Sequence, residues 1–276
     1  MKLSAGDAPA RVALVSGAAS GLGLATTAEL ARRGWTVLAG YRPRGRSAPP
    51  AAPFPGARVH WLPLDITDAA ARTLALKTLV STQGRLDALV HSAGVLGSGP
   101  LEEVPEDTLR TVMEVNFFAT VALTRTFLPL MREQRSGVIA FLSSLSGLIA
   151  RPFDGAYAAS KHALEAAAES LRHELAPFGI RVALIEPGAY ATALREAGSP
   201  AAQSAYPEYA ALRTRVEPRG QDPAEAARLI VEVIESGAPE LRVPCGAQAM
   251  AVAEKLRLLD GAARAAFALE AAGITR

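Results

Sequence analysis

The sequence has one cysteine, no excess of charge of either sign and no long hydrophobic run. Its 29 basic and 27 acidic residues leave a net charge of +2 over 276 residues, and it has no basic tail of the kind that binds nucleic acid. Cys245 has no partner for an internal disulfide, so we expect a small buried thiol. The most apolar run, residues 137–150, is too short and too rich in serine to span a membrane. The first residues also lack the apolar stretch of a secretory signal, and together these absences predict a cytoplasmic protein without a membrane segment.

The pattern of hydrophobic runs predicts an α/β fold. Half of the residues are hydrophobic and a fifth are charged, a composition that excludes a disordered chain or a coiled coil. Short β-branched runs alternate with alanine-rich stretches of helical length, which is typical of a doubly wound parallel sheet covered by helices on both faces. We expect a single domain over residues 1–276, with strands at 12–16, 36–40, 59–63, 88–91, 138–143, 182–186 and 241–243, and helices at 22–33, 69–82, 106–133, 155–178 and 223–236.

Three segments depart from this alternation. Residues 42–56 carry repeated prolines, which disfavour a helix, so we expect a surface loop there. Residues 189–220 combine glycine and proline with aromatic residues, a composition that fits a lid over an apolar ligand and equally a plain Ω-loop. Residues 244–276 predict one or two amphipathic helices, which would cover the substrate site or serve an oligomer interface.

A glycine-rich turn follows the first expected strand. Gly17, Gly21 and Gly23 are spaced G-x-x-x-G-x-G and lead into a helical stretch. Glycines permit a tight turn and let the backbone approach a pyrophosphate, whose negative charge would face the N–H groups at the helix start. Because this spacing is not the commoner dinucleotide fingerprint, the turn alone does not decide the ligand.

Three further residues suit proton transfer. Tyr157 and Lys161 are four apart in an expected helix and so share one face. A phenol has an ordinary pKa of about 10, which a nearby ammonium lowers by favouring the phenolate. The pair therefore fits a proton donor and its tuner, although such pairs also occur by chance on helix surfaces. Ser144 follows an expected strand at the sheet edge where ligands bind, and its hydroxyl could hold a substrate oxygen.

Together these motifs resemble the classical short-chain dehydrogenase/reductase family. The resemblance runs from Arg11 to about Val243, which is most of the chain. It rests on motifs that occur in the order and at the spacing of that family. These are Ser16-Gly17 with Gly21-Leu22-Gly23, Asp65 after the third strand, Val115-Asn116, Ser144, Tyr157 with Lys161, and residues 187–192 (PGAYAT).

The resemblance implies a Rossmann-type fold and a tetrad that interconverts a carbonyl and an alcohol by hydride transfer. In that tetrad Tyr157 passes the proton and Ser144 orients and polarises the substrate oxygen. Lys161 binds the nicotinamide ribose and lowers the pKa of Tyr157, while Asn116 holds a water that links Lys161 to solvent. The alternative for Asn116 is a buried amide that bonds only the helix backbone.

The same resemblance implies the ligand contacts. Expected cofactor contacts are Gly17, Ser20, Gly21, Leu22, Gly23, Tyr41, Arg42, Asp65, Ile66, Ser92, Ala93, Gly94, Tyr157, Lys161, Pro187, Gly188 and Thr192. Expected substrate contacts are Ser144, Leu145, Phe153 and Tyr190; with Ser146, Ala189, Leu194 and Tyr206 they predict a fairly apolar carbonyl or alcohol substrate.

One motif departs from the family pattern. Where the family has Asn-Asn-Ala-Gly after the fourth strand, this chain has His91-Ser92-Ala93-Gly94. His91 could be read as a catalytic base, but we expect a strand-end histidine bonded to neighbouring backbone. The histidines lack partners at metal-ligand spacing, so no metal site is expected.

The charges after the second strand favour NADP(H) over NAD(H). Folds of this type that bind NAD place an acid about 20 residues past the glycine turn, whereas an arginine suits the 2′-phosphate. No acid occurs between Glu29 and Asp65, and Arg42, Arg44 and Arg46 follow the second strand. These arginines could bond a phosphate, or they could simply solubilise the proline-rich loop.

The sequence thus predicts an NADP-dependent oxidoreductase. The alternatives are a catalytically silent NAD(P)-binding sensor or scaffold on the same fold, and an epimerase or dehydratase, for which the chain is short. We expect a homodimer or homotetramer that pairs through the helices at 106–133 and 155–178, as related proteins do. The alanine-rich run 163–168 would permit close helix packing there, but it would equally suit burial against the sheet.

Overall fold

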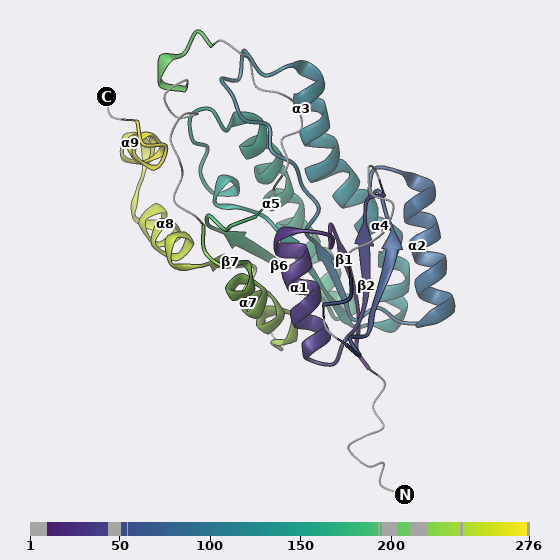
Figure 1. Cartoon of the computed structure of the whole chain (residues 1–276). Helices are drawn as coiled ribbons and strands as arrows, with labels where there is room; N and C mark the ends of the chain where they lie inside the picture. The colour runs from purple at the N-terminus through teal and green to yellow at the C-terminus, as the bar shows by residue number, and fades with distance from the viewer. Residues whose placement is uncertain are drawn as a thin grey trace, which may run out of the picture.

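The computed structural model of the chain forms a seven-stranded parallel sheet between two layers of helices (Figure 1). The structure describes residues 10–43, 51–53, 55–192, 194, 204–209, 220–237 and 240–274. The strand order is β3-β2-β1-β4-β5-β6-β7, which reverses direction at β1 as a doubly wound sheet does. The strands are β1 (Val12–Ser16), β2 (Thr36–Tyr41), β3 (Val59–Pro63), β4 (Ala88–His91), β5 (Gly137–Leu142), β6 (Ile180–Pro187) and β7 (Arg242–Cys245).

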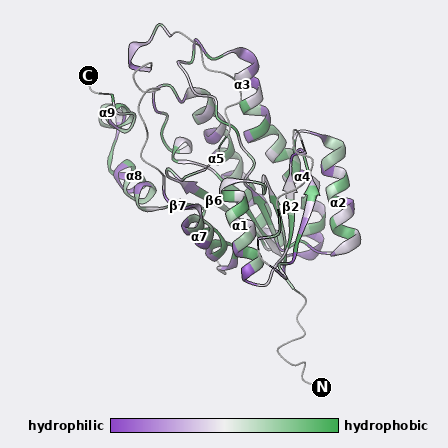
Figure 2. Ribbon diagram, in the orientation of Figure 1, coloured by the Kyte–Doolittle hydropathy of each residue, from purple (hydrophilic) through white to green (hydrophobic). Residues whose placement is uncertain are grey.

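Helices cover both faces of the sheet because the central strands are apolar on both sides. α1 (Gly21–Arg32) and α7 (Pro223–Glu235) pack against one face. α2 (Ala69–Thr82), α4 (Ala119–Gln134) and α5 (Gly155–Leu175) pack against the other. Figure 2 shows hydrophobic residues gathered on the central strands and on the helix sides that meet them. The expected fold class is confirmed.

The long helix expected at 106–133 is interrupted. It consists of α3 (Glu106–Met113), a π-helical segment η1 (Glu114–Phe118) and α4. The Thr120 hydroxyl donates to the Val115 carbonyl five residues earlier, at 3.1 Å. A π-turn adds a residue to the helix, often at functional sites, and here it contains the buried Asn116. Hydrophobic spacing cannot show such an insertion.

The end of the chain first enters the sheet and then forms two helices. β7 pairs with β6 and includes Cys245, which is fully buried as expected and lies 3.3 Å from the Tyr190 hydroxyl. α8 (Ala247–Leu258) follows beside β7, and α9 (Gly261–Ala271) lies beyond it near the C-terminus (Figure 1). Leu256 and Phe267 of these helices pack on Ile149, in the segment after β5. The tail therefore covers the part of the chain that follows Ser144.

The two expected loops are described only in part. The described residues between β2 and β3 form no helix or strand, and Arg44 and Arg46 lie outside the described residues. Much of the expected lid, 189–220, is also outside them. Its first residues are fixed where Tyr190 bridges Gln221, and its segment 204–209 packs through Tyr206 and Tyr209 on Phe153. Within the described ranges, no helix has the length and apolar character of a transmembrane span.

Candidate active site

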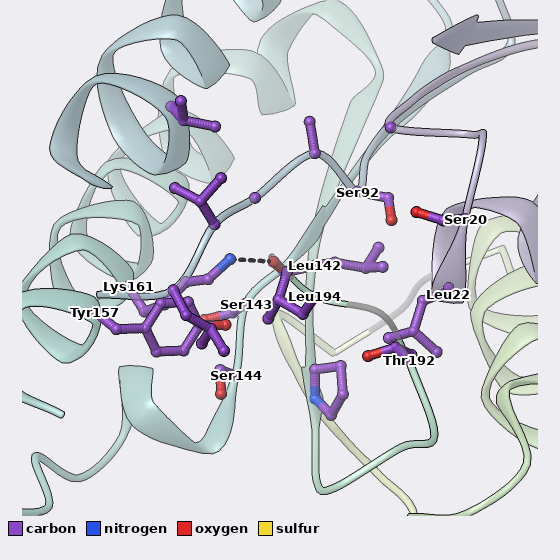
Figure 3. A pocket seen from close by; sticks show the side chains of 18 of the residues that line it. Ser20, Leu22, Ser92, Leu142, Ser143, Ser144, Tyr157, Lys161, Thr192 and Leu194 are labelled. Carbon is purple, nitrogen blue, oxygen red and sulfur yellow. Dashed lines mark hydrogen bonds between the residues drawn. The ribbon is translucent and has the colours of Figure 1, made fainter. Parts of the chain in front are cut away.

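A pocket of about 710 Å³ opens at the carboxyl ends of the central strands, where ligands bind in folds of this kind. Segments that follow β1, β4, β5 and β6 line it, together with Tyr157 and Lys161 of α5. Figure 3 shows Tyr157, Lys161 and Ser144 in one part of the pocket and Ser20, Leu22, Ser92 and Thr192 in another. Residues that are distant in the sequence therefore share one cavity, as the motifs predict.

The glycine turn is packed so closely against neighbouring backbone that side chains do not fit at Gly17 and Gly23. Gly17 has a φ of +66°, and a Cβ there would lie 2.8 Å from the Ala93 Cα. A Cβ on Gly23 would lie 2.3 Å from the Gly17 carbonyl oxygen. Gly23 does not line the pocket, so its part is to let α1 pack closely on the turn rather than to touch a ligand. The open turn at the start of α1 fits a dinucleotide pyrophosphate.

Ser16 fixes the loop that faces the glycine turn. Its hydroxyl accepts the backbone N–H groups of Ser92, at 3.2 Å, and Ala93, at 3.4 Å. This pair of bonds holds residues 92–94 against the turn, although Ser16 stands where the family has threonine and Ser92 where it has asparagine. Ser92, Ala93 and Gly94 all line the pocket.

His91 has a structural environment rather than a catalytic one. It lies behind the pocket wall, where its ring stacks on Phe141 at 4.7 Å and its Nε2 is 2.9 Å from the Thr124 hydroxyl. The expected bond to neighbouring backbone is therefore wrong, because Thr124 of α4 supplies a side-chain partner. Burial lowers the pKa of His91 to about 3, so the ring is neutral at physiological pH.

Tyr157, Lys161 and Ser144 meet in the pocket as expected. Lys161 Nζ donates to the Leu142 carbonyl at 2.8 Å, the dashed line in Figure 3, and lies 5.6 Å from the centroid of the Tyr157 ring. Ser144 caps the short helix η2 (Leu145–Gly147) and accepts the Ser146 N–H at 3.1 Å. One turn of α5 and the end of β5 thus place a phenol, an ammonium and a hydroxyl together.

The electrostatics of this trio differ from the expected tuning. Burial, with the nearby Asp154 charge, raises the pKa of Tyr157 above its ordinary value, although the Ser144 hydroxyl acts to lower it. Burial also lowers the pKa of Lys161 to about 8. Tyr157 is therefore a neutral phenol at neutral pH, and the depression of its pKa by Lys161 is not seen. The physical reason is that both groups are desolvated, which disfavours the phenolate more than this ammonium favours it.

Asn116 lies beside the pocket and not on its wall. Its Oδ1 accepts the Val95 N–H at 2.9 Å, and its Nδ2 donates to the Val95 carbonyl and the Ser160 hydroxyl, both at 2.9 Å. The side chain is buried and ties the loop after β4 to α5. The amide is buried, as the alternative expects, but its partners are loop backbone and the Ser160 hydroxyl and not helix backbone.

The expected cofactor contacts line the pocket with two exceptions. Gly23 is one, and Tyr41 is the other, since its ring packs edge-on against Trp61 at 6.2 Å. Arg42 and Asp65 are both in the wall, at the end near β2. Asp65 also shapes its own turn, because its Oδ1 accepts the Thr67 N–H and hydroxyl at 3.0 and 2.7 Å.

The expected substrate contacts divide. Ser144 and Tyr190 line the pocket, as do Ala189 and Leu194, whereas Leu145 and Phe153 do not. Phe153 has a φ of +66° and packs on Tyr206 and Tyr209 instead of lining the pocket.

Sequence reasoning missed the charged residues of this wall. Arg151 and Asp154 line it and form an ion pair at 3.3 Å, and the Ser146 hydroxyl donates to Asp154 at 2.6 Å. The sequence feature that could have indicated them is an arginine and an aspartate three positions apart, directly before the helix expected to begin at 155. Ser143 is a further wall residue that was not expected. The substrate end is therefore less apolar than predicted.

Known proteins are similar to this chain in both sequence and fold. Residues 11–202 match the family described as short chain dehydrogenase. An uncharacterized oxidoreductase of Bacillus subtilis, YusZ, is 36% identical over 250 residues, which cover 86% of this chain and 89% of that protein. Both findings agree with the motifs that line the pocket.

Solved structures agree as well. A short-chain dehydrogenase from Streptomyces avermitilis superposes with a TM-score of 0.78 at 35% identity, over 91% of this chain and 95% of the other. A short chain dehydrogenase from Burkholderia cenocepacia, solved in complex with NADP, has a TM-score of 0.74 at 28% identity, over 94% of this chain and 96% of the other. This chain belongs to the short-chain dehydrogenase/reductase family of oxidoreductases.

Proposed function

We propose that this protein is an NADP(H)-dependent oxidoreductase that interconverts a carbonyl and an alcohol by hydride transfer. One observation carries the proposal: Ser144, Tyr157 and Lys161 line the same pocket as the glycine turn. A proton-transfer group and a dinucleotide cradle in one cavity are what hydride chemistry requires, since the cofactor supplies the hydride and the protein supplies position and protons.

The residues that would hold NADP(H) form a continuous wall. Gly17, Ser20 and Gly21 would face the pyrophosphate at the start of α1, where backbone N–H groups and the helix dipole favour negative charge. Asp65 and Ile66 would contact the adenine side, and residues 92–94 with Pro187, Gly188 and Thr192 would line the nicotinamide side. Lys161 would bind the nicotinamide ribose.

The chain's own groups would move the proton. Tyr157, held as a neutral phenol by burial, donates its proton to the substrate oxygen in the direction of reduction and takes it back in oxidation. The Ser144 hydroxyl holds the same oxygen as charge develops on it. Lys161 keeps a positive charge beside the phenol, which stabilises Tyr157 after the proton has left. Asn116 supports the loop at Val95 and the Ser160 end of α5.

The charges at the adenine end favour the phosphorylated cofactor. Arg42 lies in the pocket wall, and no acid occurs between Glu29 and Asp65 to bond a ribose 2′-hydroxyl. A guanidinium there would make charge-assisted hydrogen bonds to a 2′-phosphate. We include a homo-oligomer in the proposal.

Equilibrium binding of NADPH and of NADH to the purified chain, followed by nicotinamide fluorescence or calorimetry, tests this proposal. We expect NADPH to bind at least about tenfold more tightly, because only NADPH carries the phosphate that Arg42 would bond. A preference for NADH would contradict the role of Arg42 and leave the pocket assignment intact. Failure of both to bind would contradict the dinucleotide site itself.

A further inference from the structure

A buried group of charged side chains adjoins Lys161 on the side of α5 that covers the sheet. Glu165 lies one helical turn after Lys161 and is 4% exposed, and Glu186 of β6 is 1% exposed. Arg242 of β7 joins the two carboxylates: its Nε lies 2.9 Å from Glu165 Oε2 and 3.8 Å from Glu186 Oε1. Its Nη2 also reaches the exposed Glu169 at 3.0 Å.

Burial of this charged group costs free energy, and its charges are incompletely paired. Enclosing two carboxylates costs free energy that one guanidinium offsets only in part. Glu186 Oε1 is buried and accepts no hydrogen bond within the described part of the chain. A well-packed apolar set of similar volume would be no less stable, so fold stability alone does not account for the group.

The Glu165 carboxylate lies near Ser143, a residue of the pocket wall. A Cβ on Gly147 would lie 3.0 Å from Glu165 Oε1 and 2.7 Å from Ser143 Oγ. Both oxygens therefore lie close to the position that a side chain at residue 147 would occupy. Ser143 lines the pocket and follows Leu142, whose carbonyl accepts the Lys161 ammonium. Glu165 is therefore placed beside the lysine and its anchoring strand end, while Arg242 holds the other carboxylate oxygen.

We infer that Glu165 and Arg242 are positioning residues for Lys161: the carboxylate keeps the buried ammonium charged, and the guanidinium holds the carboxylate in place. The inference rests on the proposed function, which gives Lys161 its part in dinucleotide binding.

The electrostatics support this arrangement. Burial lowers the pKa of Lys161 to about 8, and the Glu165 charge acts to raise it. Burial raises the pKa of Glu165, which Ser143 and Arg242 act to lower. Glu186 is faced by Glu165, Arg242 and Arg257, and burial raises its pKa to about 7. Glu165 is thus the charged group on α5 that acts on Lys161, and Tyr157 on the same helix is neutral.

The sign of the expected pH effect follows from these directions. Lys161 carries its charge below a pKa of about 8, so binding to the nicotinamide ribose weakens as the pH rises through that value. Glu165→Gln removes the charge that raises this pKa and keeps the length of the side chain. We expect the midpoint at which NADPH binding weakens to move to lower pH by about one unit. The experiment is a fluorescence titration of the full chain with NADPH from about pH 6.5 to about pH 10.

A matched control and a second variant complete the test. Glu169→Gln removes the other carboxylate of α5 that pairs with Arg242, and this carboxylate is exposed. It should leave the midpoint unchanged. The triple variant Glu165→Gln/Glu186→Gln/Arg242→Gln removes the buried charges together. It should show the same downward shift and serves as the test if the single variant fails to fold. A wild-type midpoint in Glu165→Gln, or in the triple variant if the single variant does not fold, overturns the inference, and so does an equal downward shift in Glu169→Gln. Absence of NADPH binding by the wild type at every pH overturns the proposed function instead, so the two failures are distinguishable.

Discussion

The two ends of the pocket are built from different parts of the chain. The dinucleotide end is mostly backbone: positive φ angles at Gly17 and Gly21, and contacts so close that a Cβ would overlap main-chain atoms. The proton-transfer end is made of side chains on α5 and after β5, namely Tyr157, Lys161 and Ser144, and burial shifts the first two in pKa. The dinucleotide end therefore depends on glycines that have no Cβ, and the proton-transfer end depends on the environment of a few functional groups.

This difference predicts that the two ends fail differently when altered. A substitution in the glycine turn should weaken binding by displacing the backbone that forms the turn, whereas one at the proton-transfer end should leave binding intact and remove chemistry. The tests below measure dinucleotide binding at one end of the pocket and turnover at the other.

The largest effect on binding is expected from Gly23→Ala. Its Cβ would lie 2.3 Å from the Gly17 carbonyl oxygen, which is backbone and cannot rotate away. We expect the affinity for NADPH to fall at least about 100-fold, or about 2.7 kcal/mol, in a calorimetric titration. Gly237→Ala is the control, because no atom lies within 4 Å of its Cβ position. A dissociation constant within about twofold of wild type would show that the cradle is not close-packed.

A smaller and selective effect is expected from Arg42→Gln. Loss of the guanidinium should weaken NADPH by about tenfold, the value of a hydrogen bond to a charged group, and leave NADH unchanged. Arg58→Gln, which removes an equal charge from an exposed residue outside the pocket wall, is the matched control. If Arg42→Gln weakened the binding of NADPH and NADH equally, Arg42 would support the pocket structurally and would not recognise the 2′-phosphate.

The sequence predicted the fold and most of the cofactor end because those features follow from local rules. Alternation of apolar runs fixes the strands, and glycine spacing fixes the turn. The resemblance, not the spacing alone, assigned Tyr157 and Lys161 their roles. The π-turn that buries Asn116 has no signature in hydrophobic spacing.

Long-range packing accounts for what the sequence did not show. Phe153 turns toward Tyr206 and Tyr209, 53 and 56 positions later, and Glu165 meets Arg242 across 77 positions. His91 pairs with Thr124 through a contact between β4 and α4. Each of these contacts depends on how separate elements sit on the sheet, which single-sequence patterns do not contain.

The most direct test that binding and chemistry depend on different ends of the pocket is Tyr157→Phe, with NADPH affinity and turnover measured on the same preparation. Turnover uses a carbonyl substrate found by screening the wild type. We predict that the dissociation constant stays within about twofold, because the ring is retained, and that turnover falls at least about 100-fold, because the proton donor is lost. Turnover near the wild-type rate would contradict the assignment of Tyr157 and the chemistry built on it.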